Sequence, residues 1–580
     1  MAEAAGERQG RRASRALLAL AVLAATPARA GFVDVTVAAG LSYVQQEPRD
    51  VGDCRVLQGL FCVPERMTGG AAVADVDRDG DLDLFVTRLG APNRLYCNRL
   101  VETGVAGFED CTAGSGLDAV AVDSNGAAFG DLDGDGDPDL YVTAVASERF
   151  YLFVNDGAGH FTEEAVARGA ALDTGFTHLG YGVEIADYDG DGWLDIHVNE
   201  WGTPVLAALE PGHPGHTRLL RNRGASQPGF FDDVTAAAGV AIDPADEWSF
   251  ASALRDLDGD GAPDLAIASD YGTSKLFWND GDGTFTEGGA AAGVATDQNG
   301  MGSTLGDADG DGDLDWFVTS IYENAPTCTG ERCDWGTSGN RLYRNDGERH
   351  FSDQTGDAAT GLRDGGWGWG AAFFDYDLDG DLDLVMTNGV DYPDADAETP
   401  YHDDPMRLWR NDGDGVWTEV AAAEGITDTG QGKGLLVFDY DADGDLDVFV
   451  ANDAAAPVLY ENQAAQPGGP HWLRVRALDA AGADALGAQV TIRPANGATQ
   501  RRTIGSTTHF LAWSDPAAHF GLGANPGAVE VEVKLPGVPD AIVRSLDADA
   551  LDRTLVVPEP AAAGVAAIVA LVLVRRRARG

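Results

Sequence analysis

Seven short segments of the chain share one arrangement of aspartates, and its spacing is typical of a calcium-binding loop. In each segment aspartate occupies positions 1, 3, 5 and 9, and glycine occupies position 6. Side-chain oxygens at alternate positions can converge on one hard cation, and the glycine permits the sharp turn between them. The predicted side-chain ligands are Asp75, Asp77, Asp79 and Asp83; Asp131, Asp133, Asp135 and Asp139; Asp187, Asp189, Asp191 and Asp195; Asp256, Asp258, Asp260 and Asp264; Asp307, Asp309, Asp311 and Asp315; Asp375, Asp377, Asp379 and Asp383; and Asp439, Asp441, Asp443 and Asp447.

Position 7 of the segment varies, as expected where only the backbone carbonyl binds the ion. An EF-hand would have a glutamate at position 12, but here position 12 is apolar and is expected to belong to a strand. We therefore expect aspartate at position 9 to complete the coordination, with about seven structural Ca²⁺ ions in all. The residues at position 7 are Asp81, Asp137, Trp193, Ala262, Asp313, Asp381 and Asp445.

The charge of the whole chain agrees with a cation-binding protein. Its 580 residues include 94 Asp+Glu against 39 Lys+Arg, a formal net charge of −55. With 44% hydrophobic residues, 12 Trp and 22 Phe, the composition favours a packed protein over an acidic disordered chain. Residues 463–557 are nearly balanced, with 8 Lys+Arg and 9 Asp+Glu, so the acidity belongs to the repeats. Nucleic acid is excluded as a partner because binding it needs a basic surface.

The residues around the loops predict strands. An apolar, glycine-rich run such as "NGAAFGDL" precedes each loop and a run such as "DLYVT" follows it, so each loop is expected at the tip of a β-hairpin. A second pair of strands follows, for example "FYLFVN" and a strand after a turn. Four strands repeated seven times, with starts 51 to 69 residues apart, predict an all-β fold with a seven-bladed β-propeller and a small β-rich domain after it.

The two ends of the repeat region are expected to meet. The seventh repeat stops at "VLYENQ" and lacks a fourth strand, while "GFVDVTVAAG" from Gly31 matches "GFFDDVTAAAG" of the third repeat. The first segment can therefore complete the last blade and close the ring, which would protect the sheet edges.

The loops and their surroundings resemble the FG-GAP (VCBS) repeats of integrin α-like propellers over residues 31–462. After a linker at 463–470, segments such as "LGAQVTIR" and "DPAAHFGLG" in residues 471–557 resemble the ASPIC/UnbV domain of cartilage-acidic-protein-like secreted proteins. His509, Asp515 and His519 of that domain are interpreted mainly as framework. The resemblance implies fold and calcium binding, but propellers of this kind serve both adhesion proteins and enzymes.

Both termini carry features of export. Residues 1–30 combine a basic start, an apolar run and the small-residue site Ala28-Arg29-Ala30, the layout of a signal peptide. Residues 558–580 contain Pro-Glu-Pro, fourteen apolar residues and an arginine cluster, and resemble a PEP-CTERM sorting signal; a permanent membrane anchor is the alternative. Together they predict an exported protein at the cell surface or in the matrix of a Gram-negative bacterium, with transient inner-membrane anchoring.

The cysteines agree with export. The six of them fall into three pairs close in sequence, which predicts three local disulfides; zinc is the weaker alternative because no CxxC pair exists. The pairs are Cys54 with Cys62, Cys97 with Cys111, and Cys328 with Cys333.

Two classes of function remain at this point. The first is a calcium-stabilised binding or adhesion module for an extracellular glycan or protein; the second is an extracellular enzyme of the polysaccharide lyase or phosphoesterase kind. The sequence has no GxSxG or HExxH motif, and its histidines are scattered, which favours binding. We expect long connections at 199–217, 321–339 and 388–406 to lie at the end away from the calcium turns, with aromatic residues as plausible ligand contacts. Those aromatic residues, which could equally pack blades together, are Tyr181, Trp201, Trp248, Trp367 and Trp369.

Overall fold

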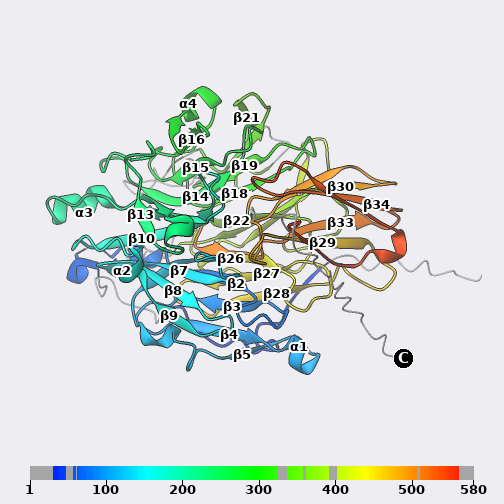
Figure 1. Ribbon diagram of the computed structural model, residues 1–580, viewed down its shortest axis with the longest axis horizontal. Helices are drawn as coiled ribbons and strands as arrows, with labels where there is room; N and C mark the ends of the chain where they lie inside the picture. Colours follow the sequence, from blue (N-terminus) through cyan, green and yellow to red (C-terminus); the bar gives the residue numbers. More distant parts are fainter. Residues whose placement is uncertain are drawn as a thin grey trace, which may run out of the picture.

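Strands make up most of the regular structure in the computed structural model (Figure 1). The structure describes residues 31–46, 56–60, 62–322, 336, 338–356, 361–390, 401–505 and 510–560. Helices in these ranges are few and short, and none is long and apolar enough to cross a membrane. The all-β prediction is confirmed. The helices are α1 (Leu100–Thr103), α2 (Ala165–Arg168), α3 (Thr203–Leu209) and α4 (Gly289–Ala292), with 3-10 turns at Val56–Gly59, Pro64–Arg66, Leu117–Ala119, Gly224–Ser226 and Ala548–Ala550.

Each aspartate loop joins the first two strands of a four-stranded antiparallel unit. Seven such units can be traced within the described residues, and the second and third are joined into one eight-stranded sheet. The units are β2 (Ala71–Ala74), β3 (Asp83–Val86), β4 (Arg94–Asn98) and β5 (Phe108–Asp110); β6 (Ser124–Gly130), β7 (Asp139–Ser147), β8 (Tyr151–Asn155) and β9 (Phe161–Glu163); β10 (His178–Ala186), β11 (Asp195–Glu200), β12 (Arg218–Asn222) and β13 (Phe231–Asp233); β14 (Ser249–Arg255), β15 (Asp264–Ser269), β16 (Lys275–Asn279) and β17 (Phe285–Glu287); β18 (Ser303–Gly306), β19 (Asp315–Val318), β20 (Arg341–Asn345) and β21 (Phe351–Asp353); β22 (Gly368–Phe374), β23 (Asp383–Asn388), β24 (Arg407–Asn411) and β25 (Trp417–Glu419); and β26 (Gly432–Phe438), β27 (Asp447–Asn452) and β28 (Val458–Asn462) with β1 (Phe32–Asp34).

The second strand of each unit is apolar on both faces because neighbouring units cover it on both sides. In β7, Leu140, Tyr141 and Val142 are all buried, although consecutive side chains of a strand point to opposite faces. A sheet with one face in water would alternate apolar and polar residues instead. The continuous apolar runs that follow the loops are therefore a consequence of stacking between units.

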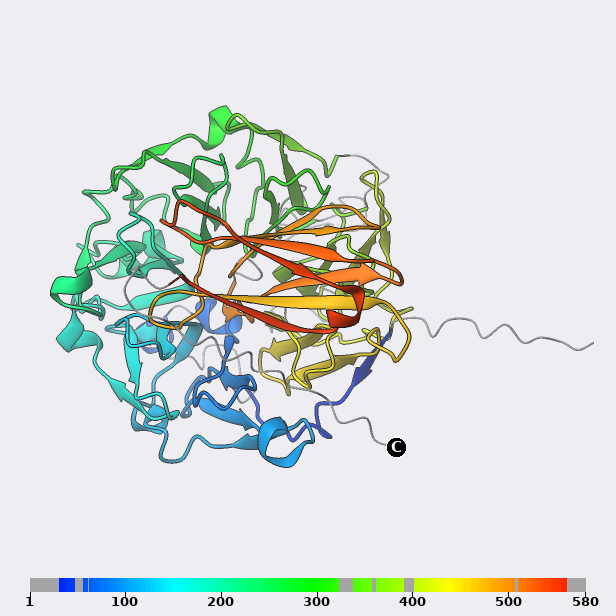
Figure 2. The same cartoon turned by 45° about the vertical axis from the view of Figure 1, so that its right-hand side comes forward.

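The units follow one another around a closed ring. The first strands of neighbouring units contact each other in the order β2, β6, β10, β14, β18, β22 and β26, and β26 contacts β2 again. The N-terminal strand β1 pairs antiparallel with β28, with Phe32 opposite Asn462, as the sequence match predicts. Figure 2 shows the blue start of the chain beside the yellow-green strands of the last unit. The last unit is therefore built from the two ends of the repeat region.

The C-terminal strands form two further sheets that lie across one side of the ring (Figure 2). One sheet has the order β33-β29-β36, with β29 and β36 parallel, and the other has the order β31-β30-β34-β35. Their bounds are β29 (His471–Leu478), β30 (Gln489–Pro494), β31 (Gln500–Thr503), β33 (Ala518–Gly523), β34 (Val529–Lys534), β35 (Ile542–Leu546) and β36 (Arg553–Pro558).

One segment of the C-terminal region enters the ring itself. The short strand β32 (Ala512–Trp513) pairs parallel with β2 of the first unit. Just before it, Phe510 and Leu511 are buried in an apolar cluster with residues from several units. The Phe510 ring lies 5.5 Å from that of Trp369 and 5.8 Å from that of Phe250. The centre of the ring is thus filled by the C-terminal region.

This packing favours one of the two roles left open for the aromatic residues, that of packing units together. Tyr181 and Trp369 are fully buried, and Trp201 and Trp367 are 4% exposed, all in the same cluster as Phe510. The reason is that their strands face the centre of the ring, where the inserted segment supplies the opposing apolar surface.

Candidate metal centres

The aspartate at position 9 anchors each loop to the strands behind it. In the second loop, Asp139 Oδ2 accepts the N–H of Leu132 at 3.1 Å and Oδ1 accepts the N–H of Asn155 at 2.9 Å. The same two bonds recur in all seven loops, to position 2 and to the asparagine that ends the third strand. Position 9 therefore fixes the loop on its hairpin, in addition to the ligand role predicted for it.

The aspartate at position 1 organises the turn from inside. Asp131 accepts backbone N–H groups of Gly134 at 2.8 Å, Asp135 at 3.1 Å and Gly136 at 2.9 Å. Gly136, at position 6, has φ 91°, a conformation that favours glycine. The carboxylate at position 5 then accepts the N–H of position 7 in every loop, for example Trp193 to Asp191 at 3.0 Å. The aspartates at positions 1 and 5 therefore accept backbone hydrogen bonds without a bound cation.

Several buried carboxylate oxygens in the loops have no hydrogen-bond partner within the described part of the chain. They are Oδ1 of Asp75 and Asp307 at position 1, of Asp133 and Asp377 at position 3, and of Asp81, Asp137 and Asp445 at position 7. A buried acceptor without a donor is costly, and a hard cation with oxygen ligands would satisfy it. The donor set of the loops therefore fits calcium.

The predicted ligands come together in space. Oxygens of Asp75, Asp77 and Asp79 lie within 4.8 Å of one another, which unites positions 1, 3 and 5. The second and third loops bring positions 1, 3 and 9 together in the same way, as Asp131, Asp133, Asp139 and as Asp187, Asp189, Asp195. The alternation of side chains read from the sequence thus places its carboxylates around common points.

The ionised carboxylates of the loops are unfavourable without a nearby positive charge. Burial, assisted by nearby carboxylates, raises the pKa of Asp83, Asp264 and Asp315 at position 9 to about 8. The same causes raise the pKa of Asp131 to about 7 and that of Asp187 to about 6. Without a cation the ionised groups repel each other at low dielectric, and a bound cation would remove that penalty.

Position 7 behaves differently from one loop to the next. The Asp137 carboxylate pairs with Arg78 of the preceding loop, a contact that needs no metal. Ala262 and Trp193 have side chains that cannot bind a cation, and their backbone N–H groups donate to the carboxylate at position 5. Asp81 is different, because its carboxylate lies within 4.8 Å of those of Asp79 and Glu102. The side chain at position 7 therefore stands apart in the second loop but close to a predicted ligand in the first.

A ring of asparagines links the seven loops, and the sequence interpretation did not assign these residues a role. Asn155 donates its side-chain N–H to the carbonyl of Val76 in the preceding loop at 2.9 Å. The equivalent bonds run from Asn98 to Tyr440, Asn222 to Leu132, Asn279 to Tyr188, Asn345 to Leu257, Asn411 to Ala308 and Asn462 to Tyr376. The recurring asparagine at the end of "RLYCN", "FYLFVN" and "KLFWN" was the signal that could have found them.

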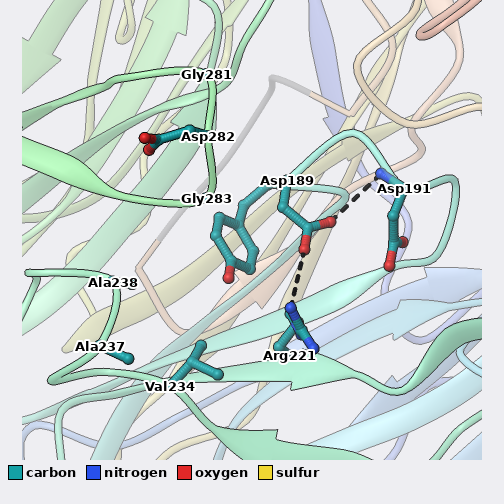
Figure 3. Close-up of a pocket in the computed structure, with 10 residues that line it drawn as sticks. Asp189, Asp191, Arg221, Val234, Ala237, Ala238, Gly281, Asp282 and Gly283 are labelled. Atoms are coloured by element: carbon teal, nitrogen blue, oxygen red, sulfur yellow. Dashed lines mark hydrogen bonds and ion pairs between the residues drawn. The ribbon is translucent and has the colours of Figure 1, made fainter.

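The third loop opens on a cavity of about 370 Å³, shown in Figure 3. Asp189 and Asp191 line it from the loop, and Asp282 lines it from a turn of the next unit. Arg221 of β12 lies 3.7 Å from Asp189 Oδ2. The cavity gives this loop a path to solvent through which a cation could reach its carboxylates.

The C-terminal sheets cover the side of the ring that carries the loops. Gly521 donates its N–H to Asp375 Oδ2 at 3.0 Å, and His519 Nε2 bonds the carbonyl of Gly444 at 2.9 Å. Arg501 donates to the carbonyl of Gly312, so bonds reach three different loops. Arg502 is half-buried, and desolvation lowers its pKa although Asp375 and Asp307 oppose the shift. The two C-terminal sheets, called the cap from here on, are thus bonded directly to loops that carry predicted calcium ligands.

The framework interpretation of the C-terminal histidine and aspartate agrees with their contacts. Asp515 pairs with Arg474 at 2.7 Å, and burial lowers the pKa of His519 to about 4. Both residues therefore hold the cap together or fasten it to the ring. His509 lies outside the described residues.

One of the three expected disulfides is present, between Cys97 on β4 and the cysteine at 111 just after β5. Cys62 is also disulfide-bonded. Cys54, Cys328 and Cys333 lie outside the described residues, as do the expected signal peptide at 1–30 and the tail from 561.

Comparison with known proteins identifies both parts of the chain. A family model described as FG-GAP-like repeat matches residues 75–142, 131–198, 256–318, 333–386 and 399–450, and one described as ASPIC and UnbV matches residues 479–564. Cartilage acidic protein 1 of Homo sapiens is 26% identical over 82% of this chain and 69% of its own length. The protein of that name from Mus musculus is 27% identical over 82% of this chain and 71% of its own.

Among solved structures, a fructofuranosidase from Schwanniomyces occidentalis aligns with a TM-score of 0.25 at 10% identity, over 63% of this chain and 82% of that chain. A likeness of that size carries no argument about fold or activity.

Proposed function

Because this chain belongs to the FG-GAP-like repeat family and carries an ASPIC/UnbV domain after its repeats, we propose that it is an exported calcium-binding β-propeller that acts as a binding or adhesion module. Its ligand would be an extracellular glycan or protein. The observation that carries the proposal is the set of seven equivalent loops, whose carboxylates converge in the first three and include buried oxygens without a donor in five.

Calcium would be held by the side chains at positions 1, 3, 5 and 9 and by the backbone carbonyl at position 7. When bound, the ion supplies positive charge and oxygen coordination, and so stabilises the loop. The protein's own residues prepare the loop for it. Position 1 orders the turn, position 9 fixes it on the hairpin, and the asparagine ring ties it to the neighbouring unit. Seven bound ions would therefore strengthen contacts between units as well as the loops themselves.

The architecture we propose for residues 31–462 is a seven-bladed propeller closed by β1. It is supported by the circular order of contacts between first strands and by the equally circular order of the asparagine bonds. Such a ring is rigid, because every unit is held by two neighbours. A rigid scaffold with a long connection such as 199–217 is suited to presenting a binding surface; most of the connections at 321–339 and 388–406 lies outside the described residues.

The side away from the cap is the better candidate for that surface. The loops lie under the C-terminal sheets, and the centre is filled by Phe510 and Leu511. The long connection at 199–217, which contains α3, lies on the side away from β29–β36 (Figure 1). A ligand would therefore contact the connections between units on this side, while calcium acts on the far side as a stabiliser.

Export to the surface or matrix of a Gram-negative bacterium remains part of the proposal. The disulfide between Cys97 and Cys111 supports an oxidising compartment. The tail from 558 would hold the protein at the inner membrane only until a transpeptidase cleaves it near Pro-Glu-Pro.

A glycan and protein array with the mature protein tests the binding role. We expect one class of ligand to bind in calcium, and binding to weaken in a chelator as the melting temperature falls. The same preparation should be assayed on polysaccharides and phosphoesters. Turnover of either substrate, with no array ligand bound, would instead support the enzyme class.

A further inference from the structure

A buried cluster of two histidines and a glutamate lies at the other end of the third unit from its aspartate loop. His178 is the first residue of β10, Glu200 is the last residue of β11, and His216 lies two residues before β12. Strands β10 and β11 pair Gly180 with Glu200, and β11 and β12 pair Val198 with Arg218, so the register brings the three side chains to one edge. All three residues are essentially unexposed.

The ligand atoms of the cluster face one another. His178 Nδ1, His216 Nδ1 and a Glu200 carboxylate oxygen all lie within 4.8 Å of each other. His216 Nδ1 is 2.7 Å from Glu200 Oε2, and His178 Nδ1 is 3.3 Å from Oε1. The two imidazole rings are 3.6 Å apart between centroids. Phe150 packs on His178 at 4.6 Å, and Glu247 Oε1 accepts the backbone N–H of His216 at 3.1 Å.

The hydrogen bond at Nε2 determines the tautomer of a neutral His178 ring. Its Nε2 lies 3.0 Å from the carbonyl oxygen of Leu172, which can only accept, so Nε2 carries the hydrogen. In the neutral ring Nδ1 is then an acceptor, and it faces the carboxylate of Glu200, which also accepts. Nδ1 of His178 has no hydrogen-bond partner among the described residues. Two acceptors in contact in a buried site require a positive charge between them.

We propose that these residues form a site for a divalent d-block cation, with zinc as the first candidate, bound by His178 Nδ1, His216 Nδ1 and the Glu200 carboxylate. Zinc binds histidine nitrogen and carboxylate oxygen at about 2.0–2.1 Å, so two tetrahedral ligands stand about 3.3 Å apart. The separation of His178 Nδ1 from Glu200 Oε1 has that value, whereas His216 Nδ1 and Glu200 Oε2, at 2.7 Å, and the two rings would have to separate as the ion binds. Binding would displace the hydrogen between His216 Nδ1 and Glu200 Oε2, which leaves as a proton.

The outer contacts agree with a metal site. Metal-binding histidines usually donate their other ring N–H to a carbonyl, carboxylate or water. His178 does so to Leu172, and His216 Nε2 bonds Thr174 Oγ1 at 2.7 Å. The N–H of Leu179 at 2.6 Å orients Glu200 Oε1. These nitrogen-rich ligands differ from the all-oxygen aspartate loops, so the site would select a softer ion than calcium.

Two other histidines nearby provide matched controls. His213 lies 4.7 Å from the His216 ring, but its Nε2 donates to the carbonyl of Thr177 at 2.8 Å and its Nδ1 accepts the N–H of Gly215 at 3.2 Å. Both of its nitrogens are therefore used. His197 on β11 is equally buried and bonds Ser252. Neither ring is available to a metal at the cluster.

The test is the metal content of the untagged, full-length mature protein. Elemental analysis after dialysis against calcium buffer should find one zinc ion per chain. A metal-free preparation should bind Co²⁺ with the visible absorption of a low-coordinate nitrogen–oxygen site. Glu200→Gln and His216→Ala should weaken binding at least ~10-fold, whereas His213→Gln and His197→Gln should keep it.

Circular dichroism and thermal melting check that each variant folds. If a variant does not fold, metal binding by the wild-type protein alone tests the proposal. A folded wild-type protein that neither carries nor takes up Zn²⁺ or Co²⁺ would overturn the proposal and leave the cluster holding a proton. Equal binding by Glu200→Gln, or loss in His213→Gln alone, would also overturn it. Because the aspartate loops are untouched, none of these results depends on whether the protein binds calcium.

Discussion

Replacing Asp377 by asparagine should stabilise the metal-free protein and leave the stability in calcium nearly unchanged. Asp377 holds position 3 of the sixth loop, and its Oδ1 is buried without a partner in the described part of the chain. Burial, and then repulsion from Asp379, raises its pKa from 3.8 to about 6. Asparagine has the same shape without the charge. Arg410, which lies near residue 377, has its own ion pair with Asp412 at 2.7 Å and would retain it in the variant.

The magnitude in the metal-free protein follows from the pKa. A shift of about two units corresponds to roughly 3 kcal/mol between the protonated and ionised forms. Because the pKa is raised on folding, the folded state holds the proton more tightly, and the metal-free protein loses this stability as pH rises from 3.8 through about 6. Asp377→Asn should therefore stabilise the metal-free protein by up to ~3 kcal/mol at pH 8 and by almost nothing at pH 4.

In calcium this gain should be cancelled, because asparagine also removes a charged ligand. If the affinity of the loop falls about 100-fold, stabilisation by bound calcium decreases by ~2.7 kcal/mol. Urea unfolding at pH 4, 6 and 8, in EGTA and in calcium, measures both effects. Asp381→Asn is the matched control, since position 7 of the same loop is exposed and should shift stability by less than ~0.5 kcal/mol in either condition. Equal destabilisation by Asp377→Asn in EGTA and in calcium would refute the reasoning, because Asp377 would then be a structural acceptor and not a cation ligand.

Three further predictions concern the ring, its centre and the tail. Deletion of residues 31–41 removes β1 and exposes the edge of β28, so we expect aggregation in sedimentation experiments; an intact monomer with unchanged melting would contradict the ring closure. Phe510→Ala should cost about 3–5 kcal/mol in urea unfolding because it empties a buried site between Phe250 and Trp369, and a cost below ~1 kcal/mol would mean that the inserted segment does not hold the cap. Mass spectrometry of the native protein should find a chain that ends near residues 557–560, whereas a surface protein that still carries "RRRARG" would indicate a permanent anchor.

Local features of the loops could be predicted because they depend only on consecutive residues. The alternation of aspartates, the glycine at position 6 and the apolar runs on either side determine a turn on a hairpin, whatever the rest of the chain does. The pairing of β1 with β28 was also predictable, since "GFVDVTVAAG" repeats a strand from inside the ring. Repetition made these predictions secure, because each copy tests the same interpretation independently.

The contacts between distant residues were decided by tertiary structure alone. No local pattern distinguishes Tyr181 and Trp369 as core residues from ligand contacts; they are buried because Phe510, more than a hundred residues later, fills the centre. The scattered histidines at 178 and 216 become a cluster with Glu200 only through the registers of β10, β11 and β12. Sequence determines what each segment can do next to its own neighbours, whereas burial and convergence of side chains depend on which distant surfaces the closed ring and its cap bring together.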